Sequence, residues 1–93
     1  MENRMLVFKE KFEKGDVVTI KLVNGTELMA FYEFDNSKNW IVSYPLEITG
    51  VDSFSSWITM GDTKRIVINK DHVLAITRSL EIWANHYKDR TKE

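Results

Sequence analysis

The dipeptide Asn24-Gly25 constrains this chain more than any other feature. Residues 18–22 alternate between apolar and polar side chains before it, which predicts a half-buried strand. A second apolar run covers residues 26–34 after it. Asn-Gly between two such runs is the strongest short signal for a β-hairpin, because a type I′ turn requires positive φ at both central residues. We therefore expect an antiparallel hairpin over residues 16–34.

The second strand, expected over residues 26–34, is long and apolar on both faces. Strand side chains alternate between faces, so Leu28 and Tyr32 share one face while Met29 and Phe31 share the other. A strand with two apolar faces usually bends and serves two layers, as in a small barrel.

A third strand is expected over residues 40–48, after a polar turn at residues 35–39. Pro45 lies inside this strand. Because proline cannot donate to a strand ladder, we expect Pro45 at a sheet edge or at a bulge. Residues 49–55 then predict a connecting loop.

Three further runs resemble strands, at residues 57–60, 65–69 and 73–77. Gly61-Asp62 separates the first two, which indicates either a bulge in one long strand or a tight turn between two strands. Together the pattern predicts a mainly β fold: a small, strongly bent, five-stranded antiparallel barrel.

The chain changes period near its C-terminus, where apolar residues recur at helical spacing. This stripe comprises Leu80, Trp83, Ala84 and Tyr87. We expect an α-helix over about residues 80–89 with Ser79 as its N-cap. A helix this short is marginal alone, so we expect it to dock through Leu80, Trp83 and Tyr87.

The N-terminal stretch is compatible with two structures. Met5, Phe8 and Phe12 are spaced for a short amphipathic helix, whereas the run from Met5 to Phe8 would equally form a strand. We favour the short N-terminal helix.

Composition indicates one folded domain over residues 1–93, with 43% hydrophobic and 29% charged residues and no linker or repeat. The absence of cysteine excludes disulfides and thiolate metal sites. The net charge of −1 is unlike that of a general DNA-binding protein. The sequence has neither an apolar run of about 20 residues nor a signal-peptide pattern. We therefore expect a cytoplasmic protein that does not enter a membrane.

The order of these elements resembles the Sm-like (LSm/Hfq-like) fold. Gly25, Asp35 and Asn39 stand at the spacings of the first Sm motif, and residues 68–76 have the frame and apolar positions of the second. The long third-to-fourth strand region and the C-terminal helix resemble Sm-like proteins carried by some phages. The resemblance covers residues 16–77.

The resemblance implies a ring that binds single-stranded RNA near its pore. The candidate RNA-binding residues are Asp35, Ser37, Lys38, Asn39, Asn69 and Lys70. Four positions depart from the family pattern: Ala30 and Lys70 replace glycines, Ser37 replaces the residue that stacks on a base, and Asn69 replaces an arginine. Since stacking is worth roughly 1–3 kcal/mol per base, we expect a weakened base pocket.

Each candidate residue also has a purely structural interpretation. Asp35 and Asn39 could serve only to stabilise their turn through side-chain to backbone hydrogen bonds. Lys38 and Lys70 could be solvated turn lysines, or a ring could gather one copy from every subunit into a positive field.

Other chemistry-bearing residues point to no catalytic or metal site. Trp40, Trp57 and Trp83 are expected in the core or at an interface rather than as nucleobase platforms. His72 and His86 lack ligands at metal-site spacing. The sequence contains no nucleophile elbow, phosphate loop or paired-acid motif, so we expect neither an enzyme nor a cofactor.

We expect two unpaired strand edges, at residues 65–69 and 73–77, to join neighbouring subunits. The candidate interface residues are Ile66, Val67, Ile68, Val73, Leu74 and Ile76. Joining two different edges closes a homo-oligomeric ring, for which the resemblance implies about five to seven subunits.

Three functions remain open at this point. The first is an RNA-binding ring. The second is an oligomeric protein-interaction module that kept the Sm fold and lost RNA binding, favoured by Ser37, Asn69 and the net charge of −1. The third is a monomeric SH3-like binding domain.

Overall fold

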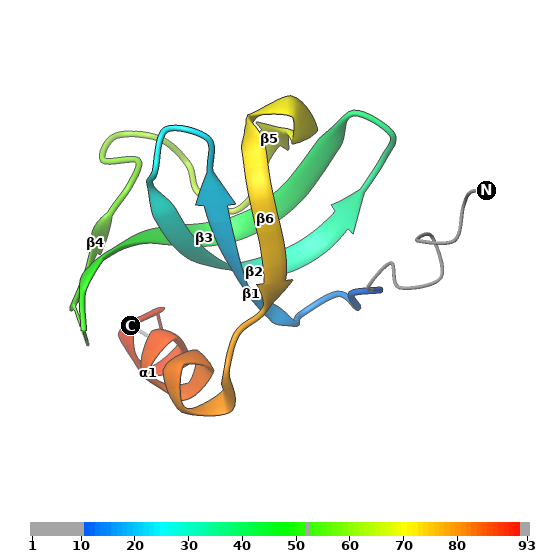
Figure 1. Ribbon diagram of the computed structural model, residues 1–93. Coiled ribbons are helices and arrows are strands. Elements are labelled where there is room, and N and C mark those ends of the chain that lie inside the picture. Colours follow the sequence, from blue (N-terminus) through cyan, green and yellow to red (C-terminus); the bar gives the residue numbers. More distant parts are fainter. Residues whose placement is uncertain (1–10, 52, 92–93) are drawn as a thin grey trace.

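The computed structural model describes residues 11–51 and 53–91 as one bent antiparallel sheet with a C-terminal helix (Figure 1). The strands are β1 (Val17–Leu22), β2 (Glu27–Asp35), β3 (Asn39–Gly50), β4 (Ser53–Ser56), β5 (Ile66–Asn69) and β6 (Val73–Arg78). A short 3₁₀ turn, η2 (Lys70–His72), joins β5 to β6, and α1 (Glu81–Thr91) follows β6. The expected mainly β, antiparallel fold with a C-terminal helix is confirmed.

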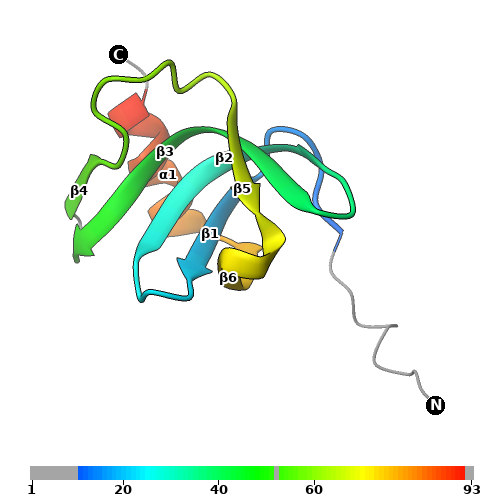
Figure 2. The same cartoon turned by 90° about the horizontal axis from the view of Figure 1, so that it is seen from above.

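The structure shows an open sheet of six strands, whereas a five-stranded barrel was expected. Its order is β4-β3-β2-β1-β6, and β5 pairs with the other end of the β3 edge that carries β4. Figure 2 shows from above how β3 runs across the molecule past the short strands β4 and β5. Within the described residues β5 pairs only with β3 and β6 only with β1, so each has an unpaired edge.

The Asn24-Gly25 hairpin is confirmed, but its turn is not type I′. Only Gly25 has positive φ (96°), and the loop closes with a hydrogen bond of 2.8 Å from the Leu22 amide to the Thr26 carbonyl. The Asn24 side-chain oxygen accepts the Thr26 amide at 3.0 Å. This is the geometry of a three-residue loop ending in a left-handed glycine. Asn24 stabilises it through its side chain.

Pro45 lies at a bulge of β3, as expected. The β2–β3 pairing passes from Met29↔Leu46 to Phe31↔Ser43, so β3 has an extra residue there. Tyr44, beside the proline, is the one non-glycine residue with positive φ (51°) in the described chain. Bulges increase local twist and bending. The bend therefore forms without a glycine in β2, where the buried Ala30 stands at the position of the glycine of the resembled family.

The expected strand at residues 57–60 is wrong, because residues 57–65 form a loop. Pairing of β3 with β4 stops at Leu46↔Ser56 and resumes with β5 at Val42↔Ile66. Between these points the Tyr44 amide donates to the Thr63 carbonyl at 2.8 Å. Pro45 has no amide proton to donate to this edge of β3. The neighbouring segment therefore leaves the sheet after Ser56 and rejoins it at Ile66, four residues further along β3.

The loop expected over residues 49–55 is also wrong, since β3 extends to Gly50 and β4 pairs with it. Ile48 lies opposite Phe54 in that pairing. Both side chains pack beside the buried ring of Tyr87. Contact with the helix thus stabilises a strand pair that local sequence does not indicate.

Two hydrophobic clusters lie on the sheet. The inner cluster contains Val18, Ile20, Leu22, Leu28, Ala30, Tyr32, Val42 and Ile68. The outer cluster is Val17, Met29 and Tyr87, with Phe31, Leu46, Ile48, Phe54, Trp83 and Ala84 packed against it. The long strand β2 therefore contributes side chains to both clusters, one from each of its faces, as expected.

The helix docks through Tyr87, which is fully buried, and through the half-buried Trp83. The Tyr87 hydroxyl donates to the Tyr44 carbonyl at 2.6 Å. Leu80 was expected to dock but precedes the helix and is 71% exposed. The expected N-cap is also wrong, because the helix begins at Glu81 and the Leu80 carbonyl accepts the Ala84 amide at 2.9 Å. The Ser79 hydroxyl instead pairs with that of Thr19 at 2.8 Å.

The expected N-terminal helix lies mostly outside the described residues, which begin at Lys11. In the part of the chain that is described, no helix is both long and apolar enough to cross a bilayer.

Candidate nucleic-acid interface

The structure brings the two halves of the expected site together. Asn39, at the start of β3, lies directly opposite Asn69, at the end of β5. The Lys70 amide donates to the Lys38 carbonyl at 2.8 Å. The turn between β2 and β3 and the turn between β5 and β6 therefore lie side by side, although about thirty residues of sequence separate them.

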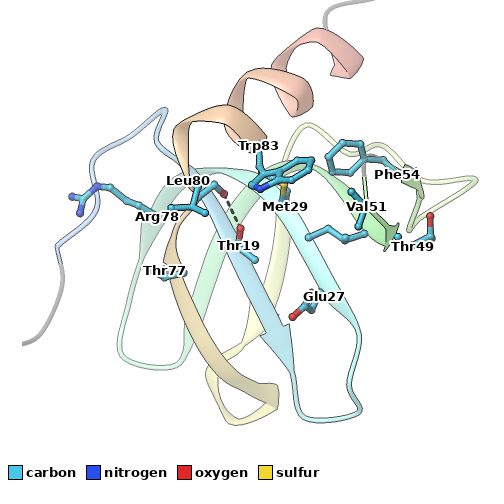
Figure 3. Close-up of a pocket in the computed structure, with 13 residues that line it drawn as sticks. Thr19, Glu27, Met29, Thr49, Val51, Phe54, Thr77, Arg78, Leu80 and Trp83 are labelled. Carbon is cyan, nitrogen blue, oxygen red and sulfur yellow. Dashed lines mark hydrogen bonds between the residues drawn. The ribbon is translucent and has the colours of Figure 1, made fainter.

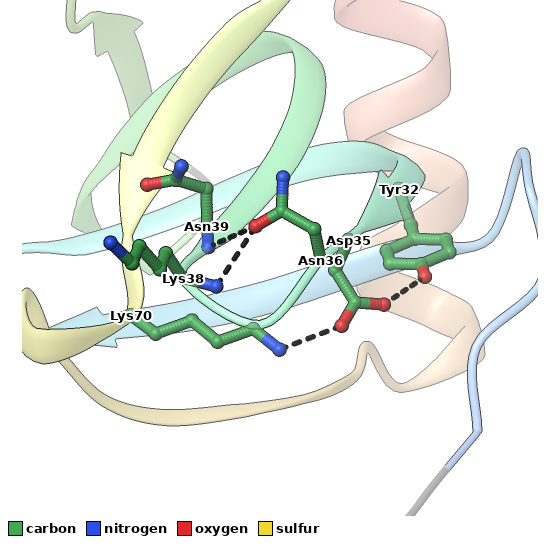
Figure 4. A network of polar contacts seen from close by, with 6 residues as sticks. All are labelled: Tyr32, Asp35, Asn36, Lys38, Asn39 and Lys70. Atoms are coloured by element: carbon green, nitrogen blue, oxygen red, sulfur yellow. Dashed lines mark hydrogen bonds and ion pairs between the residues drawn. The ribbon is translucent and has the colours of Figure 1, made fainter.

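An ion pair joins the two turns (Figure 4). The Lys70 ammonium donates to the Asp35 carboxylate at 2.7 Å, and the other carboxylate oxygen accepts the Tyr32 hydroxyl at 2.5 Å. Burial raises the pKa of Tyr32 to about 12, helped by the hydrogen bond to Asp35 and by its negative charge. Asp35 thus links Tyr32 to Lys70.

The bonds that shape the β2–β3 turn come from Asn36, not from Asp35 or Asn39. The Asn36 side-chain oxygen accepts the backbone amides of Lys38 at 2.9 Å and Asn39 at 2.8 Å. Figure 4 shows the side chains of Lys38 and Asn39 extending away from the Asp35 carboxylate. Asn36, which was not among the candidate residues, therefore makes the side-chain to backbone hydrogen bonds that were expected from Asp35 and Asn39.

The remaining candidates differ in what they offer a ligand. Asn69 caps η2, since its side-chain oxygen accepts the Asp71 amide at 2.7 Å. Ser37 is exposed and provides no ring. Within the described chain no hydrogen bond engages the Asn39 side-chain amide. Of the two facing asparagines, Asn39 is therefore the one whose side-chain amide is available to a ligand.

A hollow of about 700 Å³ lies beside the ion pair. It is lined by Lys11, Phe12, Tyr32, Asp35, Trp40, Lys70 and Ile76. Ring centroids lie 5.5 Å apart for Phe12 and Tyr32, 6.0 Å for Phe12 and Trp40, and 6.4 Å for Tyr32 and Trp40. The Lys70 ammonium stands 4.4 Å from the centroid of the Trp40 ring.

Trp40 and Phe12 also belong to this site, although the sequence pattern did not indicate them as site residues. Both are half-buried against the inner cluster, and a core or interface position was expected for Trp40. Both also line the hollow. In the sequence, the position of Trp40 directly after Asn39 was the signal that could have identified it. The folded β5–β6 turn is needed to show that Lys70 faces the Trp40 ring.

The six expected interface residues divide into three groups. Val67 and Leu74 are 61% and 68% exposed on the two unpaired-edge strands. Ile68 belongs to the core and is unavailable for side-chain contacts with another subunit. The half-buried residues are Ile66, Val73 and Ile76.

A second hollow, of about 600 Å³, lies where the start of α1 meets the tip of the β3–β4 hairpin (Figure 3). Most of its wall is apolar and includes Met29, Val51, Phe54, Leu80 and Trp83. None of the expected site residues lines it.

Metal-ligating side chains do not gather in residues 11–51 and 53–91: no three His, Cys, Asp or Glu residues come together there. The polar atoms of the site are lysine ammonium groups, one carboxylate, one phenol and side-chain amides. These groups bind by charge and hydrogen bonding.

A comparison with models of protein families and with curated proteins found no match to this chain. The fold and the geometry of the two adjacent turns therefore carry the functional argument.

Proposed function

We propose that this is an Sm-like protein that assembles into a homo-oligomeric ring and binds single-stranded RNA beside the ring's pore. The observation that carries the proposal is the contact between the two turns, where Asn39 lies opposite Asn69 and Lys70 pairs with Asp35. In the family that the sequence resembles, the residues at the positions of Asn39 and Asn69 hold the base.

Charge supports an anionic ligand despite the net charge of −1. Lys38 and Lys70 flank the two turns, and Lys11 lines the adjoining hollow. A ring repeats these lysines in every subunit around one axis, which concentrates positive potential. Binding then depends on phosphate contacts and weakens as salt increases.

The unpaired edges support the ring. β5 and β6 each have one partner strand in the described chain, and Val67 and Leu74 are exposed on them. Pairing the β5 edge of one subunit with the β6 edge of the next is a heterologous contact, which closes when the rotation between subunits allows it. The same contact extends the open sheet into a continuous one.

Fluorescence anisotropy with labelled oligo-U and oligo-A, at low and at physiological salt, tests RNA binding. We expect saturable binding that weakens at the higher salt concentration, and at least a fivefold loss of affinity in Asn39→Ala. The matched control is Asn85→Ala, an exposed asparagine on α1. Absence of binding at low salt contradicts the proposal.

A second candidate is an oligomeric protein-interaction module with the same fold. Ser37 provides no stacking ring, and the Asn69 side-chain oxygen is engaged in capping η2. This candidate predicts a multi-subunit mass together with no RNA binding at low salt. The combination of both measurements separates the two candidates.

A further inference from the structure

We infer that the hollow beside the two turns is a nucleotide subsite in which Trp40 stacks on the base and Lys70 binds the phosphate. This inference rests on the proposed RNA-binding function and assigns its stacking surface. The position that stacks in the resembled family is Ser37, which has no ring. Trp40 lies three residues further on, inside the hollow.

The aromatic wall of the hollow is built for a planar group. Trp40 meets Phe12 edge-on at an interplanar angle of 71° and Tyr32 edge-on at 65°. Both neighbouring rings therefore contact Trp40 with tilted geometry and hold its plane in place. A fixed indole presents a face at little conformational cost, and any of the bases can stack on it.

The Lys70 side chain covers one face of the Trp40 ring. Its ammonium nitrogen lies 4.4 Å from the Trp40 centroid and 2.7 Å from the Asp35 carboxylate. The same nitrogen therefore makes a cation–π contact and an ion pair. A nucleotide offers an equivalent for both, because its base can replace the ammonium on Trp40 and its phosphate can replace Asp35 as the partner of Lys70.

The exposure of the ion pair allows this exchange. The Lys70 and Asp35 side chains are 30% and 31% exposed, so Lys70 can leave Asp35 without stranding a dry, buried charge. Lys11 lines the same hollow and adds a second cation for the phosphate. After exchange Asp35 keeps the Tyr32 hydroxyl as its donor.

Intrinsic tryptophan fluorescence tests the contact between Trp40 and the base. The chain has three tryptophans, so a Trp57→Phe, Trp83→Phe variant retains Trp40 alone. Titration with unlabelled oligo-U should quench this emission with the midpoint found by anisotropy. Oligonucleotide binding that leaves the Trp40 emission unchanged overturns the subsite and leaves RNA binding in place.

Substitutions separate stacking from a structural role. We expect Trp40→Leu to weaken oligo-U binding by between about fivefold and 150-fold and Trp40→Phe, which retains a ring, to weaken it less. Trp83→Phe is the matched control outside the hollow and should bind as the unmodified protein does. Equal affinities for Trp40→Leu and Trp40→Phe, with both folded by circular dichroism, contradict stacking.

Substitution of Asp35 should strengthen binding, whereas substitution of Trp40 should weaken it. Asp35→Asn removes the carboxylate that competes with phosphate for Lys70, so affinity should rise by about two- to fivefold. Lys70→Met should lower affinity and reduce the salt dependence, whereas Lys88→Met on α1 should change neither. An affinity loss in Asp35→Asn overturns the exchange. No oligonucleotide binding by the unmodified protein overturns both this subsite and the proposed function.

Discussion

Lys70 and Asp35 are 35 residues apart in sequence, yet the ammonium nitrogen and a carboxylate oxygen lie 2.7 Å apart. This ion pair connects the β5–β6 turn to the end of β2. Asp35→Asn should nevertheless cost less than about 1 kcal/mol of unfolding free energy, because both side chains are partly exposed and Asn retains an acceptor for Tyr32. Urea titration measures this, and a loss above about 2 kcal/mol would show that the pair is a major stabilising contact.

The raised pKa of Tyr32 predicts alkaline destabilisation. The folded protein holds the phenolic proton more tightly than the unfolded chain, with a pKa of about 12 against 10.0. The resulting stabilisation is complete below pH 10 and is lost as the pH rises through about 12. Tyr32→Phe should therefore lose less stability than the unmodified protein between pH 10 and 12. Identical pH profiles in thermal denaturation would contradict this assignment.

Tyr87 should be the most sensitive position of the helix. Tyr87→Ala should cost about 3–5 kcal/mol, because it empties a fully buried site. Tyr87→Phe should cost about 1–3 kcal/mol, since it leaves the Tyr44 carbonyl without its donor. Trp83→Ala should cost less than Tyr87→Ala, because Trp83 is only half-buried. The reverse order in denaturant titrations would place the helix contact at Trp83.

Gly25 should tolerate no side chain without strain. Its φ of 96° is disfavoured for L-residues, so Gly25→Ala should cost about 1–2 kcal/mol. Gly50→Ala is the matched control, because its φ is not positive and an added Cβ meets only ordinary contacts at 3.8 Å. Equal unfolding free energies for the two variants would contradict the left-handed turn.

Local patterns predicted most of the fold. The alternation over residues 18–22 and the helical spacing after Ser79 identified elements that the structure contains, with ends shifted by one or two residues. β4 was missed because its residues, Ser53–Ser56, have little strand propensity. It forms because Phe54 packs under the helix, which is a tertiary contact that no local pattern contains.

The candidate site was predictable in position but not in composition. Motif spacing identified Asp35 and Asn39, and topology then brought Asn69 and Lys70 beside them. Trp40 was assigned to the core because a half-buried tryptophan satisfies that interpretation equally well. The stacking role proposed for Trp40 depends on which residue faces its ring, and Lys70 reaches the ring only through the pairing of β3 with β5.

The mass of the native protein tests the central proposal, a ring that gathers the two turns around a pore. The measurement is light scattering at micromolar concentration, coupled to size-exclusion chromatography. A ring of five to seven subunits has a mass of about 55 to 76 kDa, five to seven times the 10.9 kDa of one chain. A mass near 10.9 kDa would contradict the ring and the pore-side RNA site that depends on it.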